Sequence, residues 1–219
     1  MADIDVDKIL EASEKREKQK KIKSKATIGI IIAGSGLAAI IIATFIVIAV
    51  LGESSVSYFP LNAGDKFLYN RKNMSPEEWE VLNKTGKVSG YNCIILNKTD
   101  KGNFSTIQEY YFKDKKGIYK VAVSKDYGKK KEDRFVILPA RLKKGAIFDA
   151  GYYKGNLIKG KVLDREKLST PVGDVTAFKV RYKANDYDVD MWFAKNTGLI
   201  KLKNNLTGYE LNLISETKK

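Results

Sequence analysis

Residues 175–194 read VTAFKVRYKANDYDVDMWFA. Basic side chains occupy alternate positions in the first half of this stretch, and aspartates occupy alternate positions in the second half. Because successive side chains of a strand point to opposite faces of a sheet, the pattern predicts two antiparallel strands joined by a turn at Ala184-Asn185. The predicted pairs are Lys183 with Asp186, Arg181 with Asp188 and Lys179 with Asp190 on one face, and Tyr182 with Tyr187, Val180 with Val189 and Phe178 with Met191 on the other.

The three alternating aspartates of this hairpin also suggest a calcium loop. An EF-hand loop requires glycine at its sixth position and glutamate at its twelfth, where this chain has Met191 and Thr197. The predicted charge pairing already accounts for the aspartates, so we expect no metal site and no cofactor.

The same β signature extends over the chain from Ser54 onward. Short runs rich in Val, Ile, Tyr and Phe alternate with turn-forming clusters. Cys93 lies among alternating apolar residues and is predicted to be a core residue. The predicted turns are Asn62–Asp65, Asp114–Gly117, Lys143–Gly145, Pro171–Asp174 and Lys195–Gly198.

One short helix is predicted at Ser75–Leu82. Ser75 can cap it, Pro76 suits the first helical position, and Glu78 completes a capping box.

Two further stretches resemble a known group of proteins. The first is Tyr58-Phe-Pro-Leu-Asn-Ala-Gly-Asp-Lys-Phe-Leu-Tyr69, and the second runs from Thr170 to Val180 and continues in Met191-Trp-Phe-Ala-Lys-Asn-Thr-Gly-Leu-Ile-Lys201. Together they resemble uncharacterised bacterial envelope proteins that begin with Y-P-L-x-x-G and end with W-x-A-x-x-x-G-L-V-K. Ile137–Gly145 lies where such proteins repeat the opening motif. The resemblance implies a curved antiparallel sheet, like the half-barrels of lipoprotein carriers, without known catalytic residues.

A membrane-spanning segment precedes this domain. Residues 26–52 contain no charged side chain, and Ile28–Leu51 is long enough to cross a bilayer. A cleaved signal peptide has a shorter apolar region that ends in a small-residue cleavage site. This segment is longer and lacks such a site, so a cleaved signal peptide is not expected. Seven basic residues lie between Lys15 and Lys25, whereas no lysine follows the segment before Lys66, so the N-terminus is predicted to be cytoplasmic.

Small residues recur four positions apart within the predicted span. They are candidates for contact with another helix, from a protein partner or a second copy of the chain. These residues are Gly29, Ala33, Ser35, Ala39 and Ala43.

The sequence therefore predicts a mainly β protein in three parts. Residues 1–25 form a basic cytoplasmic tail, residues 26–52 a single transmembrane helix, and residues 53–219 a domain outside the cytoplasm, in a bacterial periplasm or on the cell surface. That domain is predicted to be a curved antiparallel sheet, a half-barrel or meander, with one short helix.

Composition restricts the chemistry of the chain. It has no histidine and one cysteine, which excludes His-dependent catalytic triads, His-ligated metals and intrachain disulfides. The net charge is +14, and residues 1–25 carry 8 basic and 6 acidic side chains, which leaves +12 on the remainder. A basic domain outside the cytoplasm favours acidic lipid or acidic wall polymer and not nucleic acid. The candidates for such contact are Lys129, Lys130, Lys131 and Arg134.

Two functions remain open. The first is a non-enzymatic binding or scaffold domain anchored in the envelope, which holds a lipid or a cell-wall component in the concave face of its sheet. The alternative is a structural accessory subunit of a multiprotein membrane complex, held through its helix and tail. An enzyme is disfavoured, because only carboxylate or lysine chemistry is left.

Overall fold

The computed structural model describes residues 52–123 and 134–219. The predicted tail, the membrane span with its candidate contact residues Gly29, Ala33, Ser35, Ala39 and Ala43, and Lys129, Lys130 and Lys131 lie outside the described residues. Within the described ranges no helix has the length and apolar content needed to cross a bilayer.

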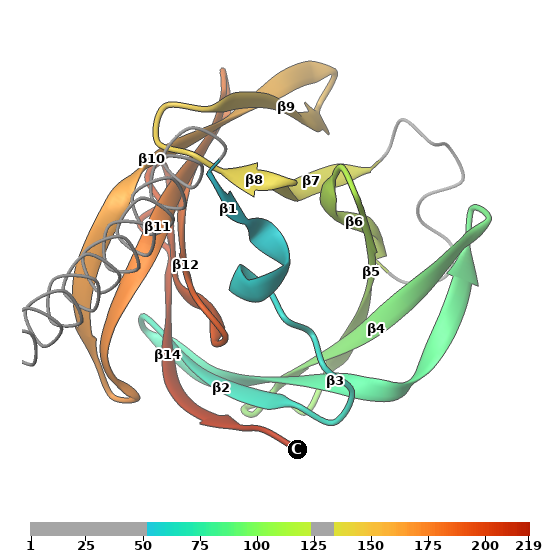
Figure 1. Ribbon diagram of the computed structural model, residues 1–219. Helices are drawn as coiled ribbons and strands as arrows, with labels where there is room; N and C mark the ends of the chain where they lie inside the picture. Colours follow the sequence, from blue (N-terminus) through green and yellow to red (C-terminus); the bar gives the residue numbers. More distant parts are fainter. Residues whose placement is uncertain (1–51, 124–133) are drawn as a thin grey trace, which may run out of the picture. The chain divides into compact units, whose positions relative to one another are not determined.

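A curved antiparallel sheet of twelve strands makes up nearly all of the described chain (Figure 1). Strands that follow each other in sequence pair within β2–β7 and within β9–β14, and the last strand, β14, returns to pair with β2. The prediction of a mainly β, curved antiparallel domain is confirmed. The strands are β2 (Lys66–Arg71), β3 (Met74–Val88), β4 (Tyr91–Asp100), β5 (Thr106–Asp114), β6 (Gly117–Val123), β7 (Phe135–Pro139), β9 (Ile147–Tyr153), β10 (Asn156–Thr170), β11 (Gly173–Ala184), β12 (Tyr187–Ala194), β13 (Gly198–Asn204) and β14 (Glu210–Thr217).

The sheet consists of two similar meanders, β2–β7 and β9–β14. The same turn opens both: the Gly64 amide donates to the Val81 carbonyl at 2.8 Å, and the Gly145 amide donates to the Val162 carbonyl at 2.8 Å. The long strands β3 and β10 each change register directly after these valines. The turn that ends at Gly145 thus has the same backbone hydrogen bond as the turn that contains Gly64.

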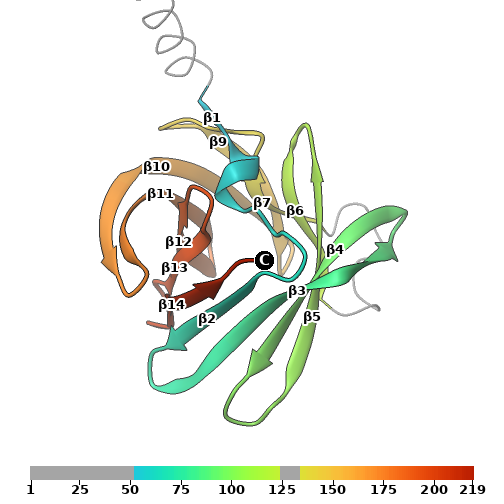
Figure 2. The same cartoon turned by 60° about the horizontal axis from the view of Figure 1, so that its bottom comes forward.

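The first residues of the domain lie inside the curve of the sheet. We call residues 52–65 the entry segment; it contains β1 (Glu53–Ser54), which pairs with β8 (Arg141–Leu142), and the 3₁₀-helix η1 (Ser55–Tyr58). The ring of Tyr58 lies 5.2 Å from that of Phe178, and the ring of Phe59 lies 5.4 Å from Tyr111 and 5.9 Å from Phe193. The entry segment therefore fills the concave face (Figures 1 and 2).

A second apolar cluster lies on the opposite face of β4, β5 and β6. Alternation separates the two faces, so Leu96 belongs to the main core and Ile95 to the second cluster. Cys93 is fully buried in this second cluster, which confirms it as a core residue. Burial raises the pKa of its thiol.

The predicted helix at Ser75–Leu82 is wrong, because these residues belong to strand β3. Trp79 pairs with Phe67 on β2, and its buried ring packs 4.4 Å from Tyr69. The helix signals are local, and burial of this indole between two strands outweighs them. Pro76 is tolerated because it lies beside an irregularity of the β2–β3 ladder, where no amide donor is needed.

The hairpin of residues 175–194 forms as predicted, but the predicted register is wrong by two residues. The turn is at Asn185-Asp186, so Lys183 lies opposite Asp188 and Arg181 opposite Asp190. A shift of two keeps every side chain on its predicted face. All five turns predicted from the sequence lie in turns or connections of the structure.

Replacing Phe59 with alanine should lower the free energy of unfolding by about 3–5 kcal/mol, because the ring is buried between Tyr111 and Phe193. Val56 in the same segment is 48% exposed, and its replacement with alanine should cost less than about 0.5 kcal/mol. Urea unfolding followed by tryptophan fluorescence measures both. Equal stability of the two variants would show that the entry segment does not hold the core together.

Candidate functional site

A groove runs along the line where the two edge strands of the sheet, β7 and β9, meet. It has a volume of about 350 Å³ and opens to solvent. We call it the seam groove. Its lining residues come from β6, β7, β9, β10 and the residue before β7: Tyr119, Arg134, Val136, Asp149, Ala150, Gly151, Tyr152 and Leu157.

The groove exists because β7 and β9 approach each other without forming a ladder. In the described residues no backbone pairing joins them. Gly151 allows the approach, since a Cβ at this position would lie 2.9 Å from the Arg134 carbonyl oxygen, and its φ of +141° disfavours other residues. From the interior, the buried Tyr182 hydroxyl donates to the Ile137 carbonyl of β7. The Tyr182 side chain thus covers the junction of β7 and β9 on its inner side.

Two tyrosine rings and one guanidinium contribute to the wall of the groove. The Arg134 guanidinium lies 5.3 Å from the centre of the Tyr91 ring and 5.2 Å from that of Tyr119. Tyr152 is 64% exposed and presents its ring to solvent. Asp149 is ion-paired with Lys159 at 2.5 Å. Such a wall can stack against a flat, partly apolar ligand and hydrogen-bond its polar edge.

Arg134 is the one described member of the predicted anionic-contact set. The structure places it against two tyrosine rings, which hold its guanidinium in a fixed position at the groove. Whether Lys129, Lys130 and Lys131 adjoin it lies outside the described residues.

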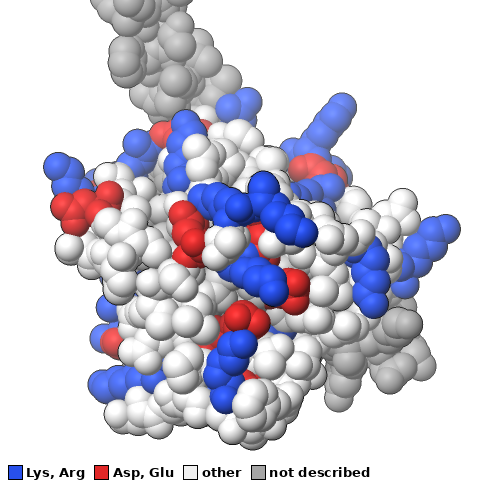
Figure 3. Space-filling model, turned by 90° about the horizontal axis from the view of Figure 1, so that it is seen from below, with Lys and Arg blue, Asp and Glu red and all other residues white. Residues whose placement is uncertain are grey.

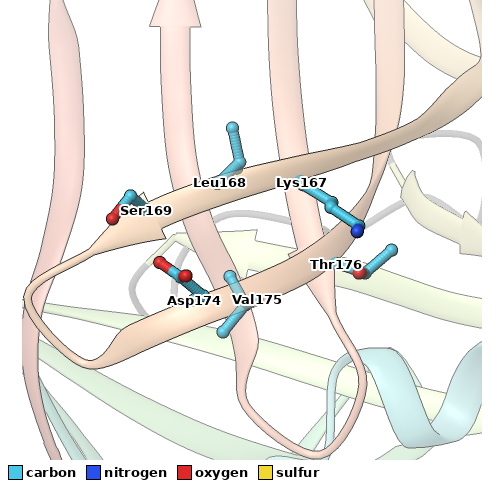
Figure 4. A pocket seen from close by; sticks show the side chains of 6 residues that line it. All are labelled: Lys167, Leu168, Ser169, Asp174, Val175 and Thr176. Atoms are coloured by element: carbon cyan, nitrogen blue, oxygen red, sulfur yellow. The ribbon is translucent and has the colours of Figure 1, made fainter.

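A second hollow, of about 410 Å³, lies against the hairpin of β10 and β11 (Figure 4). All of its lining residues belong to this one hairpin, and Leu168 pairs directly with Val175 across it. Because no other element contributes a side chain, the hollow lacks the convergent groups of a binding site. The lining residues are Lys167, Leu168, Ser169, Asp174, Val175 and Thr176.

A buried charged cluster lies on the concave face of β4, β5 and β6. Glu109 accepts hydrogen bonds from Lys98 at 2.7 Å, Lys120 at 3.3 Å and the Tyr111 hydroxyl at 2.5 Å. Burial alone would raise the pKa of Glu109, but the two lysines outweigh it and lower the pKa to about 2. The Lys98 ammonium also lies 3.6 Å from the centre of the Trp79 ring. All these charges have partners, so the cluster is built to hold the sheet together.

Two aspartates of the 175–194 hairpin, Asp188 and Asp190, are likewise paired. Asp190 is buried and receives two hydrogen bonds from Arg181, at 2.7 and 2.8 Å, and an ion pair from Lys179 at 3.4 Å. Burial opposes ionisation of Asp190, but Arg181 and Lys179 lower its pKa below the usual range. Within residues 52–123 and 134–219, no three His, Cys, Asp or Glu side chains are grouped to hold a metal.

The positive charge of the domain does not form one continuous patch on the face shown in Figure 3. Basic and acidic side chains are intermingled there. Cross-strand pairs such as Lys66 with Glu80, at 3.2 Å, bring opposite charges together in the sheet. Charge alone therefore does not mark a site on this face.

Sequence reasoning did not identify the seam groove. Tyr119 and Tyr152 are far apart in sequence, and their meeting depends on how the two ends of the sheet come together. The only local signal is Gly151-Tyr-Tyr153, a glycine followed by two aromatic residues on an edge strand.

Comparison with known proteins gives likeness in structure only. No family model matches the chain, and no curated protein matches it. A protein from Bacteroides fragilis NCTC 9343, inferred to be exported and described as having a YmcC-like fold, is similar with a TM-score of 0.46 and 16% identity over 74% of this chain and 99% of that one. A protein from Parabacteroides distasonis ATCC 8503, inferred to be a lipoprotein, has a TM-score of 0.39 and 11% identity over 73% and 98%. These identities are too low to transfer a function.

Glu109 should make the stability of the domain depend on pH in acid. Its pKa is depressed from 4.5 to about 2, so its contribution is complete above the ordinary value and is lost as the pH falls towards 2. Glu109→Gln should lose on the order of 2 kcal/mol at neutral pH and show a shallower decline between these pH values.

Urea unfolding at a series of pH values measures this difference. Glu80→Gln is the matched control, because Glu80 forms a solvent-exposed pair with Lys66 and should cost less than about 1 kcal/mol. Parallel pH profiles for the wild type and Glu109→Gln would contradict the depressed pKa.

Proposed function

We propose that the domain is a non-enzymatic binding module of the bacterial envelope whose seam groove takes the sugar rings of a cell-wall polymer. The observation that carries this proposal is the arrangement of Tyr119, Arg134 and Tyr152 around one open groove. Four strands and a connection supply its lining, so the site depends on the complete fold and is not a property of one loop.

Sugar rings suit this groove for a physical reason. Their C–H faces pack on aromatic rings, and their hydroxyl groups need hydrogen-bond partners at the ring edge. The exposed Tyr152 provides the face, while Arg134 and the Asp149 carboxylate provide donors and an acceptor. An open groove admits a chain that continues beyond it at both ends, which an enclosed pocket would not.

A lipid held in the concave face is less well supported. The entry segment occupies that face, and the hollow beside Phe59, Leu61 and Trp79 has a volume of only about 10 Å³. This is space for about one water molecule and not for an acyl chain. We therefore favour the wall component over the lipid as ligand.

Binding is also favoured over hydrolysis. Glycosidases use two carboxyl groups on opposite sides of the scissile bond. Asp149 is the only acidic residue among the described lining residues, and it is ion-paired with Lys159.

The envelope location rests on the predicted membrane span and its orientation. A helix at residues 26–52 with the positively charged flank inside would tether the domain at the outer side of the membrane. The tether would keep the groove within reach of the wall.

Tyr152→Ala should weaken binding to purified peptidoglycan by about tenfold, because it removes the exposed ring against which a sugar would stack. The full chain in mild detergent is sedimented with insoluble peptidoglycan, and the bound fraction is measured over a range of polymer amounts. Soluble glycan strands should compete, whereas dextran should not.

Phe104→Ala is the matched control for this experiment. Phe104 is 77% exposed on the β4–β5 connection and does not line the groove. No sedimentation of the wild type, or an equal loss in both variants, would refute the seam groove as a wall-binding site.

A further inference from the structure

Three turns at one end of the sheet share a pattern of lysine, asparagine and an exposed apolar residue. They are the β2–β3 turn with Lys72-Asn-Met74, the β4–β5 connection with Lys101-Gly-Asn-Phe104, and the β13–β14 turn with Lys203-Asn-Asn-Leu206. We call Met74, Phe104 and Leu206 the tip residues.

Backbone hydrogen bonds hold the three turns side by side. The Lys101 amide donates to the Pro76 carbonyl at 2.9 Å, which joins the β4–β5 connection to the start of β3. The Lys72 amide donates to the Glu210 carbonyl at 3.1 Å, which joins the β2–β3 turn to the start of β14. The tip residues therefore belong to one continuous end of the sheet.

The tip residues are far more exposed than apolar side chains usually are in a domain with a well-filled core. Their exposed fractions are 52% for Met74, 77% for Phe104 and 59% for Leu206. Clustered apolar exposure of this kind marks a surface that contacts another body.

Phe104 adopts a strained backbone conformation. Its φ is +57°, which favours glycine or asparagine and disfavours a bulky aromatic residue. Hydrogen bonds of the connection impose it: the Gly102 amide donates to the Asp100 carboxylate at 2.7 Å, and the Phe104 amide donates to the Asp100 carbonyl at 2.8 Å. Arg71 in turn holds the Asp100 carboxylate at 2.6 Å. The fold thus holds the aromatic ring of Phe104 in solvent although its backbone conformation is strained.

Each of the three turns brings one lysine to this end of the sheet. The Lys72 ammonium has no ion pair among the described residues, and the Asp100 carboxylate is neutralised by Arg71. Lys101 and Lys203 are exposed and pair with the half-buried Glu78 at 3.1 Å and Glu210 at 3.8 Å. Pairs of this kind contribute little, and such a lysine can exchange its partner for another anion.

From these observations we infer that the tip residues dock the domain onto an anionic lipid surface. Apolar side chains that enter the boundary between head groups and acyl chains, with lysines at head-group level, form the usual interfacial contact. A protein interface fits less well, because lysine is depleted at the centres of such interfaces. This inference is independent of the seam groove.

The geometry leaves the tips accessible to a bilayer. Figure 2 shows β1, where the chain enters the domain, at the top, and the β2–β3 and β4–β5 turns at the lower edge. A lipid surface that meets the tip residues would therefore not cover β1.

Vesicle flotation tests the inference with the full chain held in nanodiscs of phosphatidylcholine. Fluorescent acceptor vesicles contain phosphatidylcholine with phosphatidylglycerol, or phosphatidylcholine alone. The wild type should float with the anionic vesicles, and the triple variant Met74→Ser, Phe104→Ser, Leu206→Ser should lose at least about tenfold in bound fraction. Added salt should weaken the binding of the wild type.

The matched control replaces two apolar residues outside the three turns, Val56→Ser and Ile147→Ser, which are 48% and 65% exposed. It should float like the wild type, and circular dichroism checks that all variants are folded. Unchanged flotation of the triple variant, equal binding to neutral vesicles, or no flotation of the wild type would overturn the inference.

Discussion

The packing of the entry segment against the concave face of the sheet is the contact on which the rest of the domain depends. Residues 52–65 touch both meanders: the Ser55 amide donates to Ala140 at 3.1 Å, the Asn196 amide donates to Ser57 at 2.5 Å, and the Lys113 ammonium donates to the Pro60 carbonyl. The sheet lacks a ladder between β7 and β9, so these contacts replace the missing backbone hydrogen bonds. The residues that follow the predicted membrane span are thereby the ones that close the fold.

The two meanders repeat one architecture, but their two junctions differ. At one junction β14 pairs with β2 through a ladder with one irregularity, and at the other Tyr182 and Gly151 bring β7 and β9 together without a ladder. A paired junction leaves no space for a ligand, whereas an unpaired one exposes the side chains along its length. The seam groove is the consequence of this asymmetry.

Charge serves two purposes in the domain. Buried carboxylates such as Glu109 and Asp190 are surrounded by lysine and arginine, and removing either partner would leave an uncompensated charge in a low-dielectric interior. Lysines of the exposed turns make weak pairs and remain available to an outside anion. Part of the large positive charge of the domain therefore stabilises the fold. Only the exposed lysines can contact a binding partner.

The sequence alone determined the features that depend on near neighbours. The alternation in residues 175–194 established a hairpin and the face of each side chain, and glycine-containing clusters marked the turns. Burial of Cys93 also followed from its apolar neighbours. A period of two and the conformational preferences of turns are local properties, which explains why these predictions hold.

Only the tertiary structure decided the features that depend on distant partners. Residues 75–82 carry the capping signals of a helix, yet burial of Trp79 against Tyr69 makes them a strand. The exact register of the hairpin depends on contacts across the sheet, because a shift of two leaves the pattern of faces unchanged. The seam groove requires Tyr119 and Tyr152 to meet where the curved sheet comes round on itself. Such long-range contacts are set by the packing of the whole domain, and the order of residues along the chain does not reveal them.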